Sequence, residues 1–300
     1  MFSIRVPATS ANLGPGFDSL GIALKLYNSF YFKRINQGIR IELEDEKGNK
    51  IQLPLEENLV FKAMKRLFSL LQEPFDGIEI VEKIAFPFAC GLGSSATAIV
   101  AGFVGANKLL GSPLSEKAIL KLATKMEGHP DNIIPAYKGG FTINVMDGEE
   151  LIFKKLTLNE ELKIVLVVPE FRLATKKVRQ VLPGKVSYQD AVFNLSRTAL
   201  LTACLYDNDW EKFSTAMEDR LHQDYRAALI PGFKDIIKGA YKAGALGVAL
   251  SGAGPAIIAF CQDKAAKIGQ VMVDVFSEHN IDSRYIITAP DNKGIMITEE

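Results

Sequence analysis

Hydrophobic and polar residues alternate along several stretches in the first half of the chain. A period of two is typical of β-strands that bury one face. After the third such stretch, a turn at Lys47-Gly48-Asn49 is expected to fold residues 49–54 back as the second arm of a hairpin. The four predicted strands cover residues 2–9, 29–34, 38–45 and 76–85.

Three helices are predicted in the same half, where apolar residues recur every three to four positions. The first spans residues 57–72 and would bury Val60, Met64, Leu67 and Leu71. The second is apolar and ends before Gly111, a residue that commonly terminates helices. The third is expected to begin at Ser112-Pro113, with the serine as its cap, and to end at Gly128.

The second half combines helices with short apolar strands, which is typical of an antiparallel α+β module. We therefore predict an α+β protein with two domains, residues 1–158 and 159–300. The expected strands cover residues 162–169, 246–252, 254–262 and 283–289, and the expected helices cover residues 174–183, 188–206, 208–226, 231–244 and a stretch from Asp263.

The composition excludes several classes of protein. Lys plus Arg and Asp plus Glu each number 35, so the formal net charge is zero, which does not favour a nucleic-acid partner. The cysteines Cys90, Cys204 and Cys261 lie far apart without a CxxC pair, so we expect free thiols. Two uncharged stretches, residues 84–107 and 243–262, each contain five Gly or Pro residues, which argues against a membrane span. A cytoplasmic protein without a membrane partner is the expectation.

One short segment concentrates the candidate chemistry. Two glycines and two serines fall within residues 91–95, directly before an apolar helical stretch. The segment is either a tight turn or an anion-binding loop, in which glycines let backbone N–H groups approach a phosphate at a helix N-terminus. It is not a Walker A loop, because the pair Gly184-Lys185 lacks the other residues of that motif. It also lacks the strand context of a dinucleotide-binding fingerprint.

Three further segments accompany this loop. VPATSANLGPGFDSLGIAL opens the chain at residues 6–24, EGHPDN occupies residues 127–132, and ALSGAGPAIIAF occupies residues 249–260. Together with PFACGLGSSATA at residues 87–98, they resemble, in order and spacing, the signature blocks of the GHMP kinase superfamily. The resemblance covers nearly the whole chain. Within the superfamily, the first block and EGHPDN are most similar to those of homoserine kinases.

The resemblance implies a two-domain fold, with an N-terminal part like the second domain of ribosomal protein S5 and a ferredoxin-like C-terminal part. It implies ATP-dependent phosphorylation of the side-chain hydroxyl of L-homoserine, in threonine biosynthesis, with Mg²⁺ and a homodimeric assembly. Two alternatives stay open from the residues. One is a kinase of the same fold for another small alcohol, such as mevalonate. The other is a ligand sensor without catalysis.

The resemblance also implies the residues at the nucleotide and metal. Ser95 and Glu127 would hold Mg²⁺, which prefers a few hard oxygen ligands. Asn58 would contact adenine, although an N-cap role explains it equally well. The residues expected around the nucleotide are Asn58, Pro87, Cys90, Gly91, Leu92, Gly93, Ser94, Ser95 and Ala96.

For the acceptor, the resemblance implies a set of residues that suits a zwitterion. Arg179 and Arg226 would clamp a carboxylate, and Asp18 would take the ammonium group or the hydroxyl. The catalytic base is expected to be Asp131 or Asp18, assisted by Asn132, whereas His129 is expected to be structural. The residues expected at the acceptor are Asn12, Asp18, Asn132, Thr175, Arg179, Arg226 and Gly252.

Overall fold

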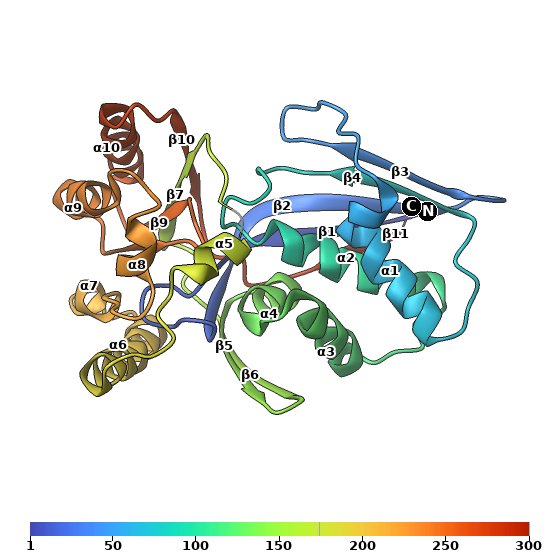
Figure 1. The fold of residues 1–300 in the computed structure, drawn as a ribbon, viewed down its shortest axis with the longest axis horizontal. Coiled ribbons are helices and arrows are strands. Elements are labelled where there is room, and N and C mark those ends of the chain that lie inside the picture. Colours follow the sequence, from blue (N-terminus) through green and yellow to red (C-terminus); the bar gives the residue numbers. More distant parts are fainter. Residues whose placement is uncertain (174, 300) are drawn as a thin grey trace.

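The structure, a computed structural model, describes residues 1–173 and 175–299; of residues 175–177 it describes the backbone only. Two lobes lie side by side, each built on one sheet (Figure 1). The mixed helix and strand content confirms the predicted α+β class.

The first lobe is built on a seven-stranded sheet. Its main path runs in the order β11-β1-β2-β4-β3, and β5 joins β2 and then β6. β3 and β4 are parallel, and the other pairs are antiparallel. The strands are β1 (Phe2–Ala11), β2 (Leu20–Arg34), β3 (Ile39–Glu44), β4 (Ile78–Lys83), β5 (Phe141–Asp147), β6 (Glu150–Leu156) and β11 (Met296–Glu299).

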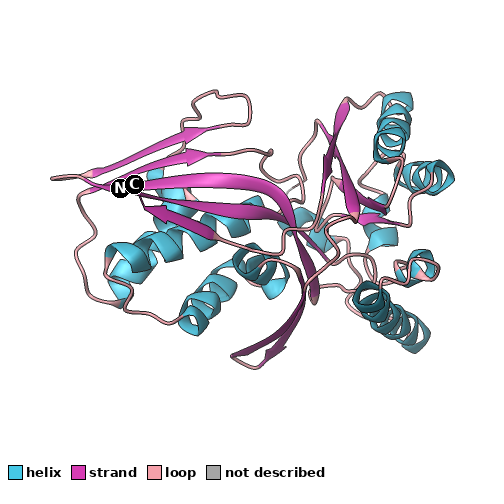
Figure 2. Cartoon of the chain, turned by 180° about the vertical axis from the view of Figure 1, so that it is seen from behind, coloured by secondary structure: helices cyan, strands magenta, loops and turns pink. Residues whose placement is uncertain are grey.

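Helices cover one face of this sheet, as the view from behind shows (Figure 2). The central helix α2 is apolar on nearly all sides, because it is enclosed by the sheet and by the neighbouring helices. The helices are η1 (Leu55–Glu57), α1 (Leu59–Leu70), α2 (Ser94–Leu109), α3 (Glu116–Glu127) and α4 (Pro130–Lys138).

The second lobe contains a four-stranded antiparallel sheet in the order β10-β7-β9-β8. Side chains alternate across β7: Val165 and Val167 pack beneath α9 and α10, whereas Ile164 and Leu166 face α6 and α7. The strands are β7 (Lys163–Pro169), β8 (Gly247–Leu250), β9 (Ile257–Cys261) and β10 (Ser283–Thr288). The helices are α5 (Thr175–Gln180), α6 (Tyr188–Asp207), α7 (Phe213–Ala216), α8 (Gln223–Ala227), α9 (Phe233–Ala243) and α10 (Ala265–Glu278).

Three predicted elements are wrong in detail. The expected hairpin is only partly formed: the N–H of Asp45 donates to the carbonyl of Asn49 and the N–H of Ile51 to that of Leu43, but residues 49–54 form no strand and make a single bridge, between Lys50 and Glu44. Helix α3 is capped by Ser115, whose side chain accepts from the N–H of Ala118, and not by Ser112. The long helix expected over residues 208–226 is divided into α7 and α8. The β5–β6 hairpin, α4 and β11 were not predicted.

Two further observations concern membrane-spanning helices and the three cysteines. Within the described ranges, no helix combines the length and the apolar character that crossing a bilayer requires. All three cysteines are free and buried, and burial raises the pKa of the Cys90 thiol to about 11. A thiol with such a pKa stays protonated at neutral pH, which agrees with a packing role.

Candidate active site

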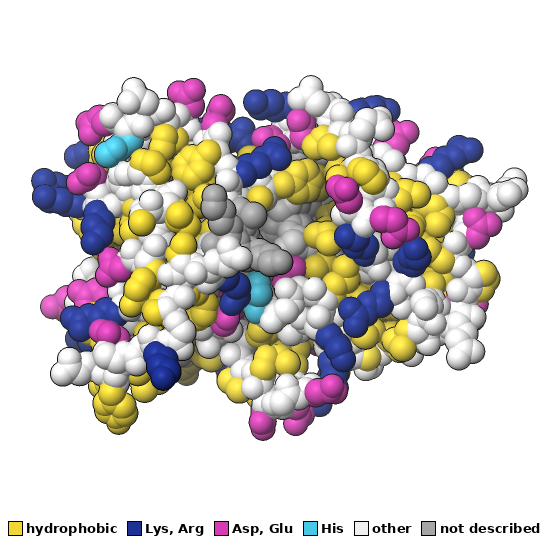
Figure 3. Space-filling view, viewed as in Figure 1, with side chains coloured by type: hydrophobic (Ala, Val, Ile, Leu, Met, Phe, Trp, Pro, Cys, Tyr) yellow, Lys and Arg dark blue, Asp and Glu magenta, His cyan; other side chains and the backbone are white. Residues whose placement is uncertain are grey.

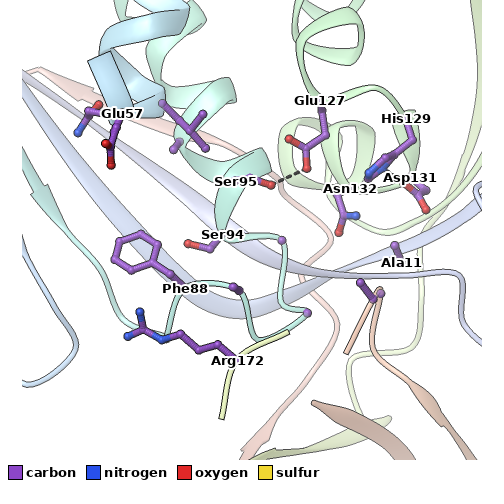
Figure 4. A pocket seen from close by; sticks show the side chains of 18 of the residues that line it. Ala11, Glu57, Phe88, Ser94, Ser95, Glu127, His129, Asp131, Asn132 and Arg172 are labelled. Carbon is purple, nitrogen blue, oxygen red and sulfur yellow. Dashed lines mark hydrogen bonds and ion pairs between the residues drawn. The ribbon is translucent and has the colours of Figure 1, made fainter. Parts of the chain in front are cut away.

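A cavity of about 730 Å³ is lined by residues of both lobes. Its lining combines apolar side chains at one end with charged groups at the other, and the Gly-rich loop lies between them. Figure 4 shows the part near the loop, where Ser95 points toward Glu127, Asn132 lies on the same side, and Ser94 points toward the side of Phe88. A concave site with a few convergent polar groups is the usual form of a small-molecule site.

The Gly-rich loop is fixed by backbone contacts on both sides. The N–H of Thr9 donates to the carbonyl of Leu92 at 3.0 Å, and the N–H of Ala256 donates to the carbonyl of Cys90 at 2.9 Å. Gly91 and Gly93 both have positive φ, 89° and 68°. The loop therefore presents the N-terminus of α2 to the cavity, where free N–H groups and the helix dipole favour an anion.

Gly93→Ala should destabilise the folded protein more than the positive φ of Gly93 alone would explain. A Cβ at Gly93 would lie 1.9 Å from Oγ1 of Thr9, which is buried and donates to Asn132. We expect the free energy of unfolding to fall by about 3 kcal/mol, from left-handed strain plus overpacking. Gly111→Ala is the matched control, because its φ is also positive but nothing lies within 4 Å. Equal losses in urea unfolding would show that the loop has room to relax.

Ser94 and Ser95 begin α2 and point toward the cavity. Oγ of Ser95 donates to Oε1 of Glu127 at 2.5 Å (Figure 4). Burial raises the pKa of the Glu127 carboxyl, although the bond from Ser95 opposes the rise. Oγ of Ser94 is buried without a hydrogen-bond partner among the described residues. A desolvated carboxylate beside a hydroxyl, with an unsatisfied hydroxyl on the neighbouring residue, fits a divalent cation and a phosphate.

Helix α4 supplies a second polar group at its first turn. Nδ1 of His129 and Oδ1 of Asp131 lie 2.5 Å apart, and Asp131 is only 1% exposed. Burial opposes the charged imidazolium, but the bond to Asp131 and its charge together raise the pKa of His129. Oδ1 of Asn132 accepts from Oγ1 of Thr9 at 2.7 Å, which fixes the orientation of this amide in the cavity wall.

The loop after β1 adopts left-handed conformations at Asn12 and Asp18, with φ of 69° and 54°. Asn12 joins the lobes, since its Nδ2 donates to the carbonyl of Gly252 at 2.8 Å and its Oδ1 accepts from the N–H of Asp18. The two oxygens of Asp18 accept from the two Nη atoms of Arg179 at 2.9 and 2.6 Å. Asp18 and Arg179 thus form a bidentate pair at the charged end of the cavity.

Arg226 is a buried cation at this end, with 2% of its surface exposed. Its Nη1 donates to the carbonyl of Gly252 at 3.1 Å and to Nδ1 of His222 at 3.2 Å, both neutral acceptors. Its Nε has no hydrogen-bond partner among the described residues. Burial and the nearby charge of Arg179 lower the pKa of Arg226 to about 10. A buried guanidinium without a bonded carboxylate is unfavourable, so the site is complementary to an anion.

The opposite end of the cavity is apolar, with two buried polar side chains in its wall. Oδ1 of Asn58 accepts from the N–H of Phe61 and caps α1, while its Nδ2 donates to Oε1 of Glu82 at 2.5 Å. The apolar lining consists of Leu43, Ile51, Leu53, Leu59, Phe88 and Ala98. This end suits a flat, largely apolar ring with a polar edge.

Comparison with known proteins now decides the family. Models of the GHMP kinase N-terminal and C-terminal domains match residues 58–140 and 200–278. A homoserine kinase of Halothermothrix orenii is 55% identical over 99% of this chain and 96% of its own. The chain belongs to the homoserine kinase family of GHMP kinases. A homoserine kinase of Moorella thermoacetica is 40% identical over 98% of this chain and 99% of its own.

Solved structures of a homoserine kinase and of a mevalonate kinase share this fold. The crystal structure of a homoserine kinase from Cytophaga hutchinsonii superposes with a TM-score of 0.88 at 33% identity, covering 99% of this chain and 96% of that one. A mevalonate kinase from Methanococcus jannaschii, at 18% identity and a TM-score of 0.67, covers 96% of this chain and 98% of its own. At that identity the likeness shows the fold alone, and the two-domain GHMP kinase fold expected from the sequence is confirmed.

Most residues expected at the site of this GHMP kinase line one cavity. Those that do are Asn12, Asp18, Asn58, Gly91, Gly93, Ser94, Ser95, Glu127, Asp131, Asn132, Arg179, Arg226 and Gly252. Four residues expected at the nucleotide, Pro87, Cys90, Leu92 and Ala96, are not among the lining residues. Cys90, Leu92 and Ala96 are buried, and the carbonyl of Pro87 accepts from Sγ of Cys90. The side chain of Thr175 lies outside the described part.

Sequence reasoning missed several residues of the cavity wall. Glu82 and Phe88 lie at the apolar end, and Arg172 lies beside Phe88 in Figure 4. Glu82 could have been found from the sequence. Glu79 and Glu82 lie three positions apart on one strand, so their side chains point to opposite faces of the sheet, and one of the two must point inward. Arg172 had none, because it follows β7 in an irregular segment.

Proposed function

We propose that the protein transfers the γ-phosphoryl group of ATP to the side-chain hydroxyl of L-homoserine, in the threonine pathway and in the cytoplasm. The names of the 55% and 40% identical relatives support this acceptor. The observation that carries the proposal is Arg226, a buried cation bonded to neutral groups and facing the same cavity as the Gly-rich loop. An amino-acid carboxylate is the anion that this end of the cavity suits.

The charged end provides groups for each part of a homoserine zwitterion. Arg226 would receive the carboxylate, and Arg179 lies beside it with its charge shared by Asp18. The Asp18 carboxylate would accept from the ammonium group through the lone pairs that Arg179 leaves free. Asn12 would hold Asp18 in place, because its Oδ1 accepts from the backbone N–H of Asp18.

The middle of the cavity would hold the phosphates. Backbone N–H groups at residues 91–95 and the hydroxyl of Ser94 would donate to phosphate oxygens. Ser95 and Glu127 would hold Mg²⁺, whose remaining ligands would be water and phosphate oxygens. The ion supplies neutralisation of charge on the transferred phosphoryl group. In the described residues no cluster of three acidic, His or Cys side chains offers an all-protein metal site, which agrees with a substrate-shared ion.

The transfer itself requires in-line attack by the acceptor hydroxyl. Its oxygen forms the bond to the γ-phosphorus while the bond to the bridging oxygen breaks, and that electron pair leaves with ADP. We assign the hydroxyl proton to Asp131, because the Asp18 carboxylate is paired with Arg179 and is assigned to the ammonium group. His129 would hold the Asp131 carboxyl in position, and Asn132 Nδ2 would orient the hydroxyl.

The division into domains is also proposed. We place the boundary between residues 158 and 159, where the chain passes from the seven-stranded to the four-stranded sheet. Strand β11 then returns and pairs with β1, so residues 296–299 close the first sheet although they end the chain. Both ends of the chain lie together in Figure 1.

We further propose that the protein is a homodimer and that α6 forms its interface. Tyr188, Leu195 and Tyr206 on this helix are 85%, 70% and 72% exposed, and Val192 and Ala199 continue the same stripe. Hydrophobic side chains protrude at the lower left of Figure 3, where Figure 1 places α6. The stripe is self-complementary, because an antiparallel copy places Tyr188 against Tyr206 and Leu195 against Ala199. Self-matching of one patch is the requirement of a two-fold interface.

Leu195→Glu should convert the dimer to a monomer. The substitution places two charges at the centre of the apolar stripe, and burying them without partners is unfavourable. In sedimentation velocity we expect the native protein at about twice 32.9 kDa and the variant at the monomer mass. Leu70→Glu on α1, also an exposed leucine, is the control and should remain dimeric. A monomeric native protein, or a dimeric Leu195→Glu variant, would contradict the interface.

The reaction is tested by identifying its product. After incubation with MgATP and L-homoserine, phosphorus NMR should show a phosphate monoester on the side-chain oxygen, formed in step with ADP. An acyl phosphate signal, or ADP formed without a phosphorylated amino acid, would show that the hydroxyl is not the acceptor.

A further inference from the structure

A buried acid lies at the apolar end of the cavity, away from the residues assigned to transfer. Glu82 is on β4 and 3% exposed, and its side chain lines the cavity. Among the described residues, its carboxyl has one hydrogen bond, the 2.5 Å contact from Nδ2 of Asn58, a neutral donor. Burial raises the pKa of the Glu82 carboxyl to about 7, and the bond from Asn58 only partly opposes this. The carboxyl is therefore protonated in a large share of molecules at neutral pH.

Glu82 lies at the end of the cavity where the nucleobase of ATP would bind. In the proposed function the Gly-rich loop would hold the phosphates, and Arg226 and Asp18, which line the same cavity, would hold the acceptor. The remaining end is lined by leucines, Ile51 and Phe88, which suit the faces of an aromatic base. Glu82 and Asn58 are the two buried polar side chains there. This inference rests on ATP being the phosphoryl donor.

We infer that Glu82 selects adenine, pairing as a protonated carboxyl with the amino group and an adjacent ring nitrogen, and that Asn58 is its positioning residue. A protonated carboxyl offers one acceptor and one O–H donor. Adenine presents the complementary pair, a donor amino group beside an acceptor nitrogen. Guanine presents donors at N1 and N2, which would suit an ionised carboxylate instead. Adenine is therefore expected to bind the protonated form of Glu82, and guanine the ionised form.

Asn58 holds the carboxyl in a fixed orientation. Its Oδ1 is occupied by the N–H of Phe61 at the start of α1, so the amide cannot flip without losing the cap. Its Nδ2 then donates to one oxygen of Glu82. Two other acids line this end, Asp45 and Glu57. The Asp45 carboxylate is already bonded to the Asn49 side chain and to N–H groups of its own turn, and Glu57 is exposed.

The experiment is nucleotide binding without acceptor, measured by calorimetry with Mg²⁺ on the full protein. The native protein should bind ATP about 100-fold more tightly than GTP or N6,N6-dimethyl-ATP, because each leaves buried polar groups unpaired. Glu82→Gln should keep ATP affinity within about threefold, because an amide also offers one donor and one acceptor. Glu82→Leu should reduce the ATP to GTP ratio to below about fivefold.

Glu79→Leu on the same strand is the control and should keep the native ratio, since Glu79 does not line the cavity. The inference is overturned if Glu82→Leu retains the native ratio. It is also overturned if native protein binds N6,N6-dimethyl-ATP as tightly as ATP, a measurement that does not depend on folding of any variant. If ATP itself does not bind, the proposed kinase function fails as well. ATP binding without base selectivity leaves that function intact and overturns this inference alone.

Discussion

Arg226→Leu should weaken the use of homoserine strongly while leaving the protein at least as stable as the native form. The guanidinium is buried, and its bonds go to a carbonyl and an imidazole rather than to a carboxylate. Removing it deletes a charge-assisted contact to the acceptor carboxylate, worth about 3 kcal/mol in a buried site. That corresponds to a rise of roughly 100-fold in KM for homoserine. KM for ATP should change by less than about threefold, because only one substrate loses a contact.

The thermal stability of Arg226→Leu distinguishes a substrate-binding role of Arg226 from a structural one. Replacing a buried cation that lacks a bonded carboxylate by an apolar residue is neutral or stabilising. The carbonyl of Gly252 keeps its bond from Asn12, whereas Nδ1 of the buried His222 loses its donor, a cost that removal of the buried charge offsets. We expect an unchanged or higher Tm. Arg220→Leu, an exposed arginine on the same lobe, is the control and should leave both KM values unchanged. Equal increases in both KM values for Arg226→Leu would contradict the assignment.

Glu127→Gln should lower kcat by roughly 1,000-fold, the rate equivalent of several kcal/mol of lost metal stabilisation. Glu127 is half-buried beside Ser95, and an amide keeps its volume and one oxygen but loses the charge. The substitution also removes a desolvated acid, so the folded protein should not be destabilised. The measurement is kcat over a Mg²⁺ titration, in which the variant should need more Mg²⁺ and recover only part of the lost rate.

Glu116→Gln is the matched control for this substitution. Glu116 begins the same helix α3 but is exposed and paired with Lys138, where an ion pair contributes little. Its kcat and Mg²⁺ dependence should equal those of the native protein. Native kinetics for Glu127→Gln would remove this residue from the metal site and leave Ser95 as an ordinary first-turn serine of α2.

Much of the fold was predictable from local patterns. Period-two stretches predicted β1, the helical period predicted α1, the apolar run before Gly111 predicted α2, and a short apolar run predicted β7, because burial of each element is written in its own residues. Local patterns could not give β11, whose pairing with β1 joins residues nearly 300 positions apart. The helix expected over residues 208–226 failed because Asp219 accepts from the backbone N–H groups of Leu221, His222 and Gln223, which begins a new turn.

Site residues could be predicted where they belong to one of the four sequence blocks, and their contacts with residues outside the blocks could not. The four sequence blocks gathered Asn12, Asn132, Gly93 and Gly252 into one cavity, because loops from both lobes meet there. The pairing of Asp18 with Arg179 was not predicted, since it joins side chains 161 positions apart. Neither was the wall at Glu82, which is an acid on an otherwise ordinary strand. Its role depends on burial, and burial is a property of the assembled sheet.

The central claim is the identity of the acceptor, and initial rates of ADP release test it most directly. The measurement compares L-homoserine with D-homoserine, L-serine, mevalonate and galactose at equal MgATP. We predict that kcat/KM for L-homoserine exceeds that for every other acceptor by at least about 100-fold, the discrimination expected of a charged clamp and a fixed hydroxyl. A higher kcat/KM for mevalonate or galactose would contradict the assignment of Arg226 and Asp18 to an amino acid. ADP release that no acceptor stimulates would contradict the proposed transfer itself.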